Sequence, residues 1–337
     1  MGIPSTNRAS SVESTRGAAR GELSQLRDAF RRRLLSSYLF LMDSTTAERS
    51  LNNAIDQELN RLHDVALAEG FAASIGFGSP AEYLSRLIDV KGLPLLCAIR
   101  FFGGDRSRPF VDIFAGDSLE ADCTVAAAAA MQAYKAFRPA CVRIIMPGTI
   151  APEVDPGWRI EQDQVLAVGR PSAMAANNSA SPVIVKLLAA KTDEAAEFVR
   201  AGYSRIAAAD AVLRQRLFPA TSEELGACAD HGHLWWWTVE GERAGIIAAK
   251  RDALLGVEGL VMVEEIVAPR FAGRGTAAVA QRALAASVLT TGTDNFILGT
   301  IDAMNTPSRS TARRAGRSEL LSWWFLTPPG EPARTRI

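Results

Sequence analysis

The sequence predicts an α/β (α+β) protein of two tandem domains, each a mixed, mostly antiparallel sheet flanked by helices. Its 337 residues are enough for two domains of ordinary size, each with its own core. Segments with helical spacing of apolar residues alternate with short apolar runs typical of buried strands. The order of these segments repeats after roughly 150 residues, which suggests a duplicated domain, although the halves share no evident sequence identity.

The expected domain boundaries follow from changes in composition along the chain. Residues 1–21 and 170–181 are rich in small and polar residues and lack apolar periodicity. We therefore expect a disordered tail at the first stretch and a linker at the second. The first domain then covers 22–169, the second covers 182–328, and a short tail follows at 329–337.

The composition narrows the classes of protein that fit. Lys and Arg together number 37, as do Asp and Glu, so the charge balance gives no reason to expect nucleic-acid or membrane-surface binding. The four cysteines lack a C-x-x-C or metal spacing and are typical of a reducing compartment. No apolar run is long enough to cross a bilayer or to form a signal-peptide core. We expect a cytoplasmic protein without a metal centre.

The most informative stretch runs from Val261 to Gly292. It begins with an apolar run typical of a buried strand, which must end before Pro269 because proline has no N–H to donate. A glycine-containing loop follows at 270–275. From Thr276 onward, apolar residues recur at helical spacing, and Gly292 offers a stop for the helix. The stretch therefore predicts a strand, a glycine loop and a helix.

This arrangement favours the binding of an anion. The start of a helix has unpaired N–H groups and the positive end of the helix dipole. Gly273 and Gly275 let the backbone approach a diphosphate closely, while Arg270 and Arg274 add positive charge. The loop lacks a complete G-x-G-x-x-G and the lysine of a P-loop. By itself it is equally well explained as a plain tight turn.

Two motifs in the right order make the signal more specific. A Gln/Arg-x-x-Gly-x-Gly/Ala loop after a V-x-P is present as Val267, Pro269, Arg270, Gly273 and Gly275. Downstream, an Asn after the next strand, a small residue three positions on and a Gly eleven positions on are present as Asn305, Ser308 and Gly316. With these motifs, the second half, from about Val183 to Thr327, resembles the GNAT acyltransferase superfamily.

The resemblance implies a bound acyl-coenzyme A, usually acetyl-CoA. Its pyrophosphate would lie on the backbone N–H groups of residues 271–276, and its pantetheine arm would pair with the strand backbone. Backbone N–H groups there would also polarise the thioester carbonyl. The implied cofactor-binding residues are Ile266, Val267, Arg270, Phe271, Ala272, Gly273, Arg274, Gly275, Thr276, Asn305 and Ser308.

Two acids in the strand are candidates for the catalytic base. An amine must lose a proton before it attacks a thioester, and a carboxylate can take that proton directly or through water. Because side chains alternate along a strand, Glu264 and Glu265 are expected on opposite faces. We favour Glu264 as the base on the acceptor side. The alternative is that each acid only pairs with a nearby arginine.

The chain departs from the family pattern at two positions. The family often has a Tyr seven residues after the Asn, which acts as an acid toward the leaving thiolate, and here that position is Ala312. Ser308, Ser310 or Thr311 could compensate, or the thiolate leaves unassisted. The Phe that often follows the family glycine is replaced by Arg317. These changes put the acid role in question.

The first half lacks the cofactor motif. Where the loop is expected, it has the sequence GDSLEADC with Asp117, Glu120 and Asp122. Acids at the start of a helix satisfy the helix dipole themselves and repel a diphosphate. We therefore expect a degenerate GNAT-like domain that does not bind coenzyme A and that either braces the second half or forms a wall of the acceptor site.

A run of three tryptophans, Trp235 to Trp237, lies in an expected strand of the second half. Alternation places Trp235 and Trp237 on one face and Trp236 on the other. The large ring areas favour packing in the core or between the domains. His231 and His233 precede this strand, and we expect loop histidines there because no other ligand cluster accompanies them.

The sequence therefore predicts an acyl-CoA-dependent N-acyltransferase that acts by direct transfer on a primary amine of a small metabolite or amino acid. Transfer from an aminoacyl-tRNA is an alternative, which the near-neutral charge disfavours. A non-catalytic CoA-binding protein is the other, and Ala312 keeps it open. The expected partner is a small-molecule amine, and a homodimer is allowed.

Overall fold

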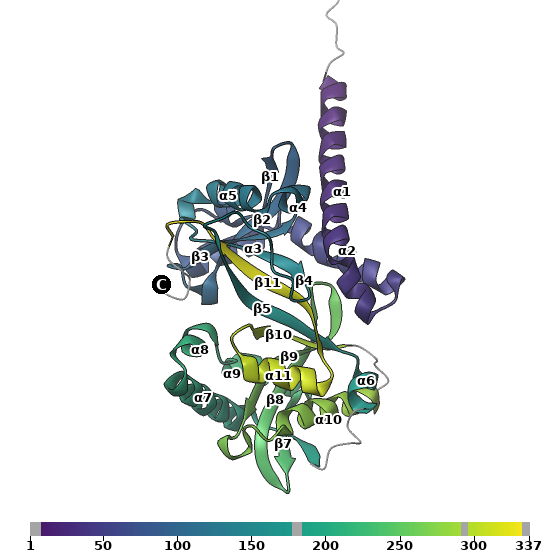
Figure 1. Cartoon of the computed structure of the whole chain (residues 1–337), viewed down its shortest axis with the longest axis vertical. Helices are drawn as coiled ribbons and strands as arrows, with labels where there is room; N and C mark the ends of the chain where they lie inside the picture. Colours follow the sequence, from purple (N-terminus) through teal and green to yellow (C-terminus); the bar gives the residue numbers. More distant parts are fainter. Residues whose placement is uncertain (1–7, 177–183, 291–295, 332–337) are drawn as a thin grey trace, which may run out of the picture.

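The structure, a computed structural model, describes residues 8–176, 184–290 and 296–331 (Figure 1). The helices are α1 (Arg8–Leu41), α2 (Ser44–Asn60), α3 (Val65–Ile75), α4 (Asp117–Ala121), α5 (Cys123–Ala133), α6 (Pro171–Ala176), α7 (Thr192–Ala209), α8 (Ala211–Arg216), α9 (Ser222–Asp230), α10 (Thr276–Thr290) and α11 (Thr306–Ala315). The strands are β1 (Arg86–Val90), β2 (Leu93–Phe101), β3 (Pro109–Ala115), β4 (Val142–Pro147), β5 (Arg159–Gly169), β6 (Val185–Ala189), β7 (Leu234–Val239), β8 (Glu242–Leu254), β9 (Val257–Val267), β10 (Phe296–Asp302) and β11 (Ser318–Thr327).

The strands of the described residues form one sheet with the order β1-β2-β3-β4-β11-β5-β10-β9-β8-β7-β6. At one end, β1, β2 and β3 are antiparallel and β3 is parallel to β4. At the other, β7, β8 and β9 are antiparallel and β9 is parallel to β10. The predicted fold class, a mixed and mostly antiparallel sheet flanked by helices, is confirmed. A duplicated unit would give this symmetry, and duplication remains a prediction.

The two halves of the chain exchange strands at the centre of the sheet. β11, from the end of the chain, lies between β4 and β5, while β5, from the first half, pairs with β10 of the second. Figure 1 shows β5 and β11 crossing side by side between the two groups of strands. The segments 22–169 and 182–328 therefore share one sheet, in which each supplies a strand that the other needs.

A chain of buried charges crosses this centre. The guanidinium of Arg143 on β4 forms two hydrogen bonds with Asp112 on β3, of 2.6 and 2.8 Å, and a third of 3.0 Å with Asp163 on β5. Arg216, at the end of α8, donates to Asp302 at 2.8 Å and to the carbonyl oxygen of Asp163 at 3.2 Å. All three aspartates are buried. Because a buried charge is costly unless it is paired, these contacts fix β5 against β4 and β10.

The helices cover the two faces of the sheet in separate groups. α10 packs on one face of β7 to β10, and α7 and α9 pack on the opposite face of β7 to β9. α3 and α5 cover the first half. α1 and α2 lie across the centre, where they contact strands of both halves, and the Tyr38 hydroxyl donates to the carbonyl oxygen of Leu255 at 2.6 Å.

The tryptophan run packs as predicted. Trp237 is fully buried and lies with Trp235 in the cluster under α10, while Trp236 lies in the cluster under α7 and α9. The Trp236 and Phe198 rings meet edge to face, with centroids 5.1 Å apart. A Cβ atom at Gly245 would lie 2.1 Å from the Trp237 ring, so the neighbouring strand needs glycine there.

Two segments differ from the expected tail and linker. α1 begins at Arg8, inside the expected disordered tail 1–21, because good helix formers such as Ala, Arg and Glu allow the helix of residues 22–41 to extend toward its N-terminus. α6 occupies 171–176 within the expected linker 170–181, since Met174 is fully buried against α10 and anchors that turn. Residues 1–7, 177–183, the expected stop at Gly292 and residues 332–337 lie outside the described residues.

The turn between β8 and β9 generates a stability prediction. Gly256 has a left-handed φ of 72°, and a Cβ atom there would lie 1.8 Å from the carbonyl oxygen of Ser50 on α2. Gly241, in the preceding hairpin turn, has a φ of 83° and open space around it. Gly241→Ala should therefore cost about 1 kcal/mol of unfolding free energy, from left-handed strain alone.

Gly256→Ala should cost at least about 2 kcal/mol more than Gly241→Ala, because the methyl group also forces α2 away from the sheet. Urea unfolding of the two variants beside the wild type measures the difference. Equal losses would mean that α2 does not press on this turn.

Candidate functional site

Strands β9 and β10 separate partway along their length. Their parallel pairing covers only Phe296, Ile297 and Leu298, opposite Gly259, Leu260 and Val261. Both strands continue beyond this point, β9 to Val267 and β10 to Asp302. The edge of β9 that faces β10 is therefore unpaired along its last residues, and we call the place where the two strands cease to pair the gap.

A β-bulge on β9 accounts for the separation. Glu264 pairs with Ala248 and Met262 pairs with Ala249, which leaves Val263 without a partner on β8. An extra residue of this kind bends its strand and increases the local twist. The bulge lies directly after the last residues that pair with β10, so it turns the end of β9 away from its neighbour.

The glycine loop follows the end of β9 and presents backbone N–H groups. Gly273 and Gly275 both have a φ of 73°, and open space lies where a side chain would be. Among the described residues, no hydrogen-bond acceptor is found for the N–H groups at the start of α10, which belong to Gly273, Gly275, Thr276, Ala277 and Ala278. With the positive end of the dipole of a 15-residue helix behind them, these groups are chemically suited to bind an anion.

The N–H groups that are free differ in part from those that the sequence predicted. The N–H groups of Phe271 and Ala272 bond to the carbonyls of Ala268 and Pro269, at 2.9 and 3.1 Å, because Pro269 starts a 3-10 turn there. Arg274 uses its N–H within the loop as well. Residues 271, 272 and 274 therefore shape the loop, and the N–H groups without an acceptor reach Ala278, two residues further into α10 than expected.

The two arginines of the loop also differ from each other. Arg270 forms an ion pair with Glu242 on β8, and its guanidinium lies 4.7 Å from the centre of the Phe271 ring. Arg274 is exposed and makes no ion pair within the described part of the chain. Of the two charges that the sequence proposed for a diphosphate, only that of Arg274 is available without breaking another contact.

The second motif, Asn305, Ser308 and Gly316, lies at the two ends of helix α11. The side-chain oxygen of Asn305 accepts a hydrogen bond of 3.2 Å from the N–H of Ser308, which makes Asn305 the N-cap, and Gly316 ends the helix with a φ of 96°. The side-chain NH2 of Asn305 makes no hydrogen bond within the described residues and is available to a ligand. Ser308 is half-buried in the first turn, while Ala312 is buried.

Glu264 lies on the α7 and α9 face of β9. Its carboxylate accepts hydrogen bonds from the N–H of Ala220 at 3.0 Å, from the N–H of Glu265 at 2.9 Å and from the Tyr203 hydroxyl at 3.3 Å. It is only 6% exposed, and burial raises the pKa of the Glu264 carboxyl despite these donors. No ion pair within 4.0 Å joins either glutamate to an arginine among the described residues, although the charge of Arg317 acts on Glu265 from a greater distance.

Glu265 and Val267 point toward the opposite, α10 face, as the alternation of the strand predicted. Oε2 of Glu265 accepts a hydrogen bond of 2.9 Å from Gln281 on α10, and Oε1 is buried without a partner. Burial raises the pKa of Glu265 to about 7, against smaller opposing effects of Gln281 and Arg317. Ile266 is buried on the face of Glu264.

The first half has the same bulge and a similar gap, but helix α1 covers them. Phe114 is unpaired between β2 and β3, and the pairing of β3 with β4 stops after Ile113. Arg33 on α1 donates to the carbonyl oxygen of Phe114, and Arg32 pairs with Asp117 at the acidic loop. Asp122 caps α5 through the N–H of Val125. In the first half, side chains of the protein therefore occupy the backbone groups whose counterparts in the second half have no partner.

Sequence reasoning missed several residues around the gap. Tyr203, Arg216 and Gln281 lie on three helices and meet β9, β5 and β10 only through the fold. No local motif marks them, because their partners are distant in sequence. Arg317 did carry a signal, since it replaces the Phe of the family pattern.

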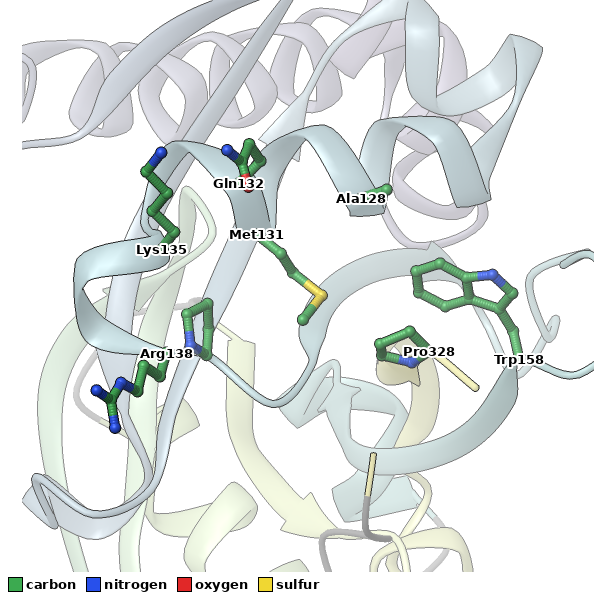
Figure 2. A pocket seen from close by; sticks show the side chains of 8 residues that line it. Ala128, Met131, Gln132, Lys135, Arg138, Trp158 and Pro328 are labelled. Atoms are coloured by element: carbon green, nitrogen blue, oxygen red, sulfur yellow. The ribbon is translucent and has the colours of Figure 1, made fainter. Parts of the chain in front are cut away.

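A surface hollow of about 340 Å³ lies elsewhere, beside α5 of the first half (Figure 2). Met131 and Trp158 point into it, whereas Lys135 and Arg138 point away. The hollow shares no residue with the gap or the glycine loop. We assign it no ligand.

Two further properties concern the described residues alone. No group of three or more His, Cys, Asp or Glu side chains in residues 8–176, 184–290 and 296–331 is arranged to hold a metal ion. Within those same ranges, no helix combines the length and apolar character that a membrane crossing requires.

Comparison with known proteins gives similar structures only. No protein-family model matches the chain, and no curated protein matches it. The chain is similar to a GCN5-related N-acetyltransferase from Sphaerobacter thermophilus, with 14% identity and a TM-score of 0.43 over 71% of this chain and 78% of that one.

It is also similar to a GNAT-family acetyltransferase from Colwellia psychrerythraea, with 10% identity and a TM-score of 0.45 over 80% and 96% of the two chains. A third similar structure is a GCN5-related N-acetyltransferase from Kribbella flavida, with 13% identity and a TM-score of 0.37 over 80% and 96%. These identities lie below 25% and these TM-scores below 0.5, so we take no activity from these proteins.

The environment of Glu265 generates a prediction about pH and stability. Its pKa in the folded protein, about 7, lies above the value of 4.5 of a free side chain. Below pH 4.5 the carboxyl is protonated in both the folded and unfolded states. As pH rises from 4.5 to 7, only the unfolded state ionises, so the unfolding free energy should fall by up to about 3 kcal/mol.

Glu265→Gln should remove this fall, because an amide does not titrate. Glu258→Gln, on an exposed residue of the same strand, should keep the wild-type profile. Urea unfolding at several pH values measures all three proteins. A Glu265→Gln profile parallel to that of the wild type would show that the carboxyl ionises at an ordinary pH.

Proposed function

We propose that this protein is an acyl-CoA-dependent N-acyltransferase, with acetyl-CoA as the simplest donor and a primary amine of a small metabolite or amino acid as the acceptor. The observation that supports this most is the continuity of three features along β9. An unpaired strand edge, an array of free N–H groups and a buried carboxylate lie within one strand, one loop and one helix turn.

The donor half of the site fits the chemistry of coenzyme A. A diphosphate needs several N–H donors and positive charge, which the start of α10 and Arg274 supply. The pantetheine arm contains amide groups that can bond to an exposed strand edge, as an added strand does. Such an edge exists on β9 after Val263, with Ile266 and Val267 in it. The thioester would then lie beside the bulge.

The part of the site that would bind the acyl acceptor has the chemistry that an amine needs. An amine is mostly protonated at neutral pH and must become neutral before it attacks the thioester carbon. The carboxylate of Glu264, whose pKa is raised by burial, is a stronger base than an exposed one. A carboxylate also attracts a cationic amine before the proton moves. We therefore assign Glu264 as the base, acting directly or through water, and backbone N–H groups on the edge of β9 that is unpaired with β10 as donors to the oxyanion.

Binding of coenzyme A is the first test. Gly273→Glu should weaken the binding of acetyl-CoA and free CoA at least about tenfold, because the new carboxylate repels the diphosphate. Gly92→Glu is the matched control, since Gly92 is also left-handed, with a φ of 84°, and has open space around it. Titration calorimetry measures both variants and the wild type. If wild-type protein binds neither ligand, the proposed function is wrong.

Catalysis is the second test, followed as release of the CoA thiol from acetyl-CoA with a panel of primary amines. Glu264→Gln should lower kcat about 100-fold, a typical loss for a general base. Tyr203→Phe removes one hydrogen bond to Glu264 and keeps the carboxylate, so its kcat should fall much less. Equal rates for Glu264→Gln and wild type would exclude Glu264 as the base.

A further inference from the structure

Three polar side chains meet inside the apolar core between β9, α10 and the start of β11. Gln281 donates to Glu265 at 2.9 Å and accepts from Nη1 of Arg317 at 3.4 Å. The guanidinium of Arg317 also donates to the carbonyl oxygens of Ala167 and Gly299, at 3.0 and 3.3 Å. Gln281 is 1% exposed and Arg317 is 4% exposed. The three form one connected chain of contacts.

These contacts reach the gap between β9 and β10. Gly299 is the first residue of β10 beyond the last pair with β9, and a Cβ atom there would lie 3.3 Å from Nη2 of Arg317. Glu265 lies on β9 just past the bulge at Val263. The contacts of Arg317 and Gln281 thus link the two strands on either side of the gap.

The hydrogen bonding of this cluster is incomplete. Oε1 of Glu265 and Nε of Arg317 are buried without partners, although an unsatisfied buried group is costly. Glu264, by contrast, uses both carboxylate oxygens. A buried carboxyl with one free oxygen is able to give or take a proton without losing the bonds that hold it.

We propose that Glu265 carries a proton on the α10 side of the gap and that Gln281 and Arg317 are the positioning residues that orient it and balance its charge once the proton has left. This inference rests on the proposed acyltransferase function. The ligand on which Glu265 would act is the thiolate that leaves the acyl group. Glu264 would serve the amine from the other face of the same strand.

The neutral amine attacks the thioester carbon, a C–N bond forms, and the C–S bond then breaks with its electron pair on sulfur. The sulfur takes the proton of the Glu265 carboxyl and becomes a thiol. The carboxylate that remains keeps the hydrogen bond from Gln281 and the positive charge of Arg317 nearby. The proton that the nitrogen of the adduct releases restores the carboxyl.

The charges around Glu265 decide the direction of each test. From the turn between α11 and β11 it faces Arg317, and from its own strand the carboxylate of Glu264, while α10 contributes the neutral Gln281. Burial lowers the pKa of Arg317 to about 10, so its guanidinium stays positive at neutral pH. Arg317 and Gln281 both favour the ionised carboxylate. Removing either should therefore move the ionisation of Glu265 to higher pH.

The first experiment needs no ligand. Melting temperature is followed against pH for the wild type, Gln281→Met, Arg317→Met and Arg317→Lys. The wild-type loss of melting temperature ends near the pH at which Glu265 ionises in the folded state. This end point should move upward by about one pH unit in Gln281→Met and Arg317→Met, and less in Arg317→Lys, which keeps the charge. If Arg317→Met does not fold, Gln281→Met decides. An unchanged end point would overturn the inference.

The second experiment measures thiol release from acetyl-CoA with an amine against pH. Glu265→Gln should lower kcat about tenfold or more and remove the fall of kcat at high pH. Gln281→Met should keep that fall and move it upward, a change that a purely structural role would not produce. A wild-type kcat and pH profile in Glu265→Gln would overturn the inference while the acyltransferase function stands. Absence of both CoA binding and turnover in the wild type would instead refute the acyltransferase function and, with it, the catalytic role of Glu265.

Discussion

Strands β5 and β11 pair along most of their length at the centre of the sheet, and each lies among strands of the other half of the chain. Without β11, β4 would lose its antiparallel neighbour, and without β5, β10 would lose its own. At the same place, the guanidinium groups of Arg143 and Arg216 contact the buried Asp163 of β5. Since a misplaced buried charge is costly, this network favours one register of β5 over its alternatives.

The two halves share a bulge and a gap but differ in what surrounds each. In the second half the bulge at Val263 lies before a glycine loop and a helix start, where the N–H groups of Gly273 and of residues 275–278 have no acceptor in the described structure. In the first half, the carbonyl oxygen of Phe114, the bulged residue, accepts a hydrogen bond from Arg33. Asp117 of the acidic loop pairs with Arg32. The acidic loop of the first half and the arginine-bearing helix α1 thus pair with each other. In the second half, the N–H groups at the start of α10 have no such partner among the described residues, and such groups favour the binding of an anion.

The two glutamates of β9 show how neighbouring residues acquire different chemistry. Burial of the carboxyl groups raises both pKa values. Glu264 receives three hydrogen bonds that partly offset this effect, while Glu265 receives one and keeps a bare oxygen. The strand places one on each face of the sheet, so that one carboxyl looks toward α7 and α9 and the other toward α10.

The sequence by itself determined the elements whose causes are local. Alternation and proline set the limits of β9, glycines at 273 and 275 marked the loop, and the motif of Asn305 and Gly316 proved to be the two caps of α11. Strand alternation also placed Trp236 opposite its neighbours, and Glu264 opposite Glu265. These features depend on residues within a few positions of one another, where backbone geometry is decisive.

Only the tertiary structure decided the strand exchange, the cover of the first-half gap by α1 and the partners of the acids. Arg317 follows α11 yet bonds to Gly299 and Gln281, and Arg216 reaches Asp302 across 86 positions of sequence. Pairing between strands, and the burial that shifts a pKa, depend on which segments meet in space. No spacing in the sequence encodes that meeting, because hydrogen-bond ladders and buried charges form between any segments that the whole fold brings together.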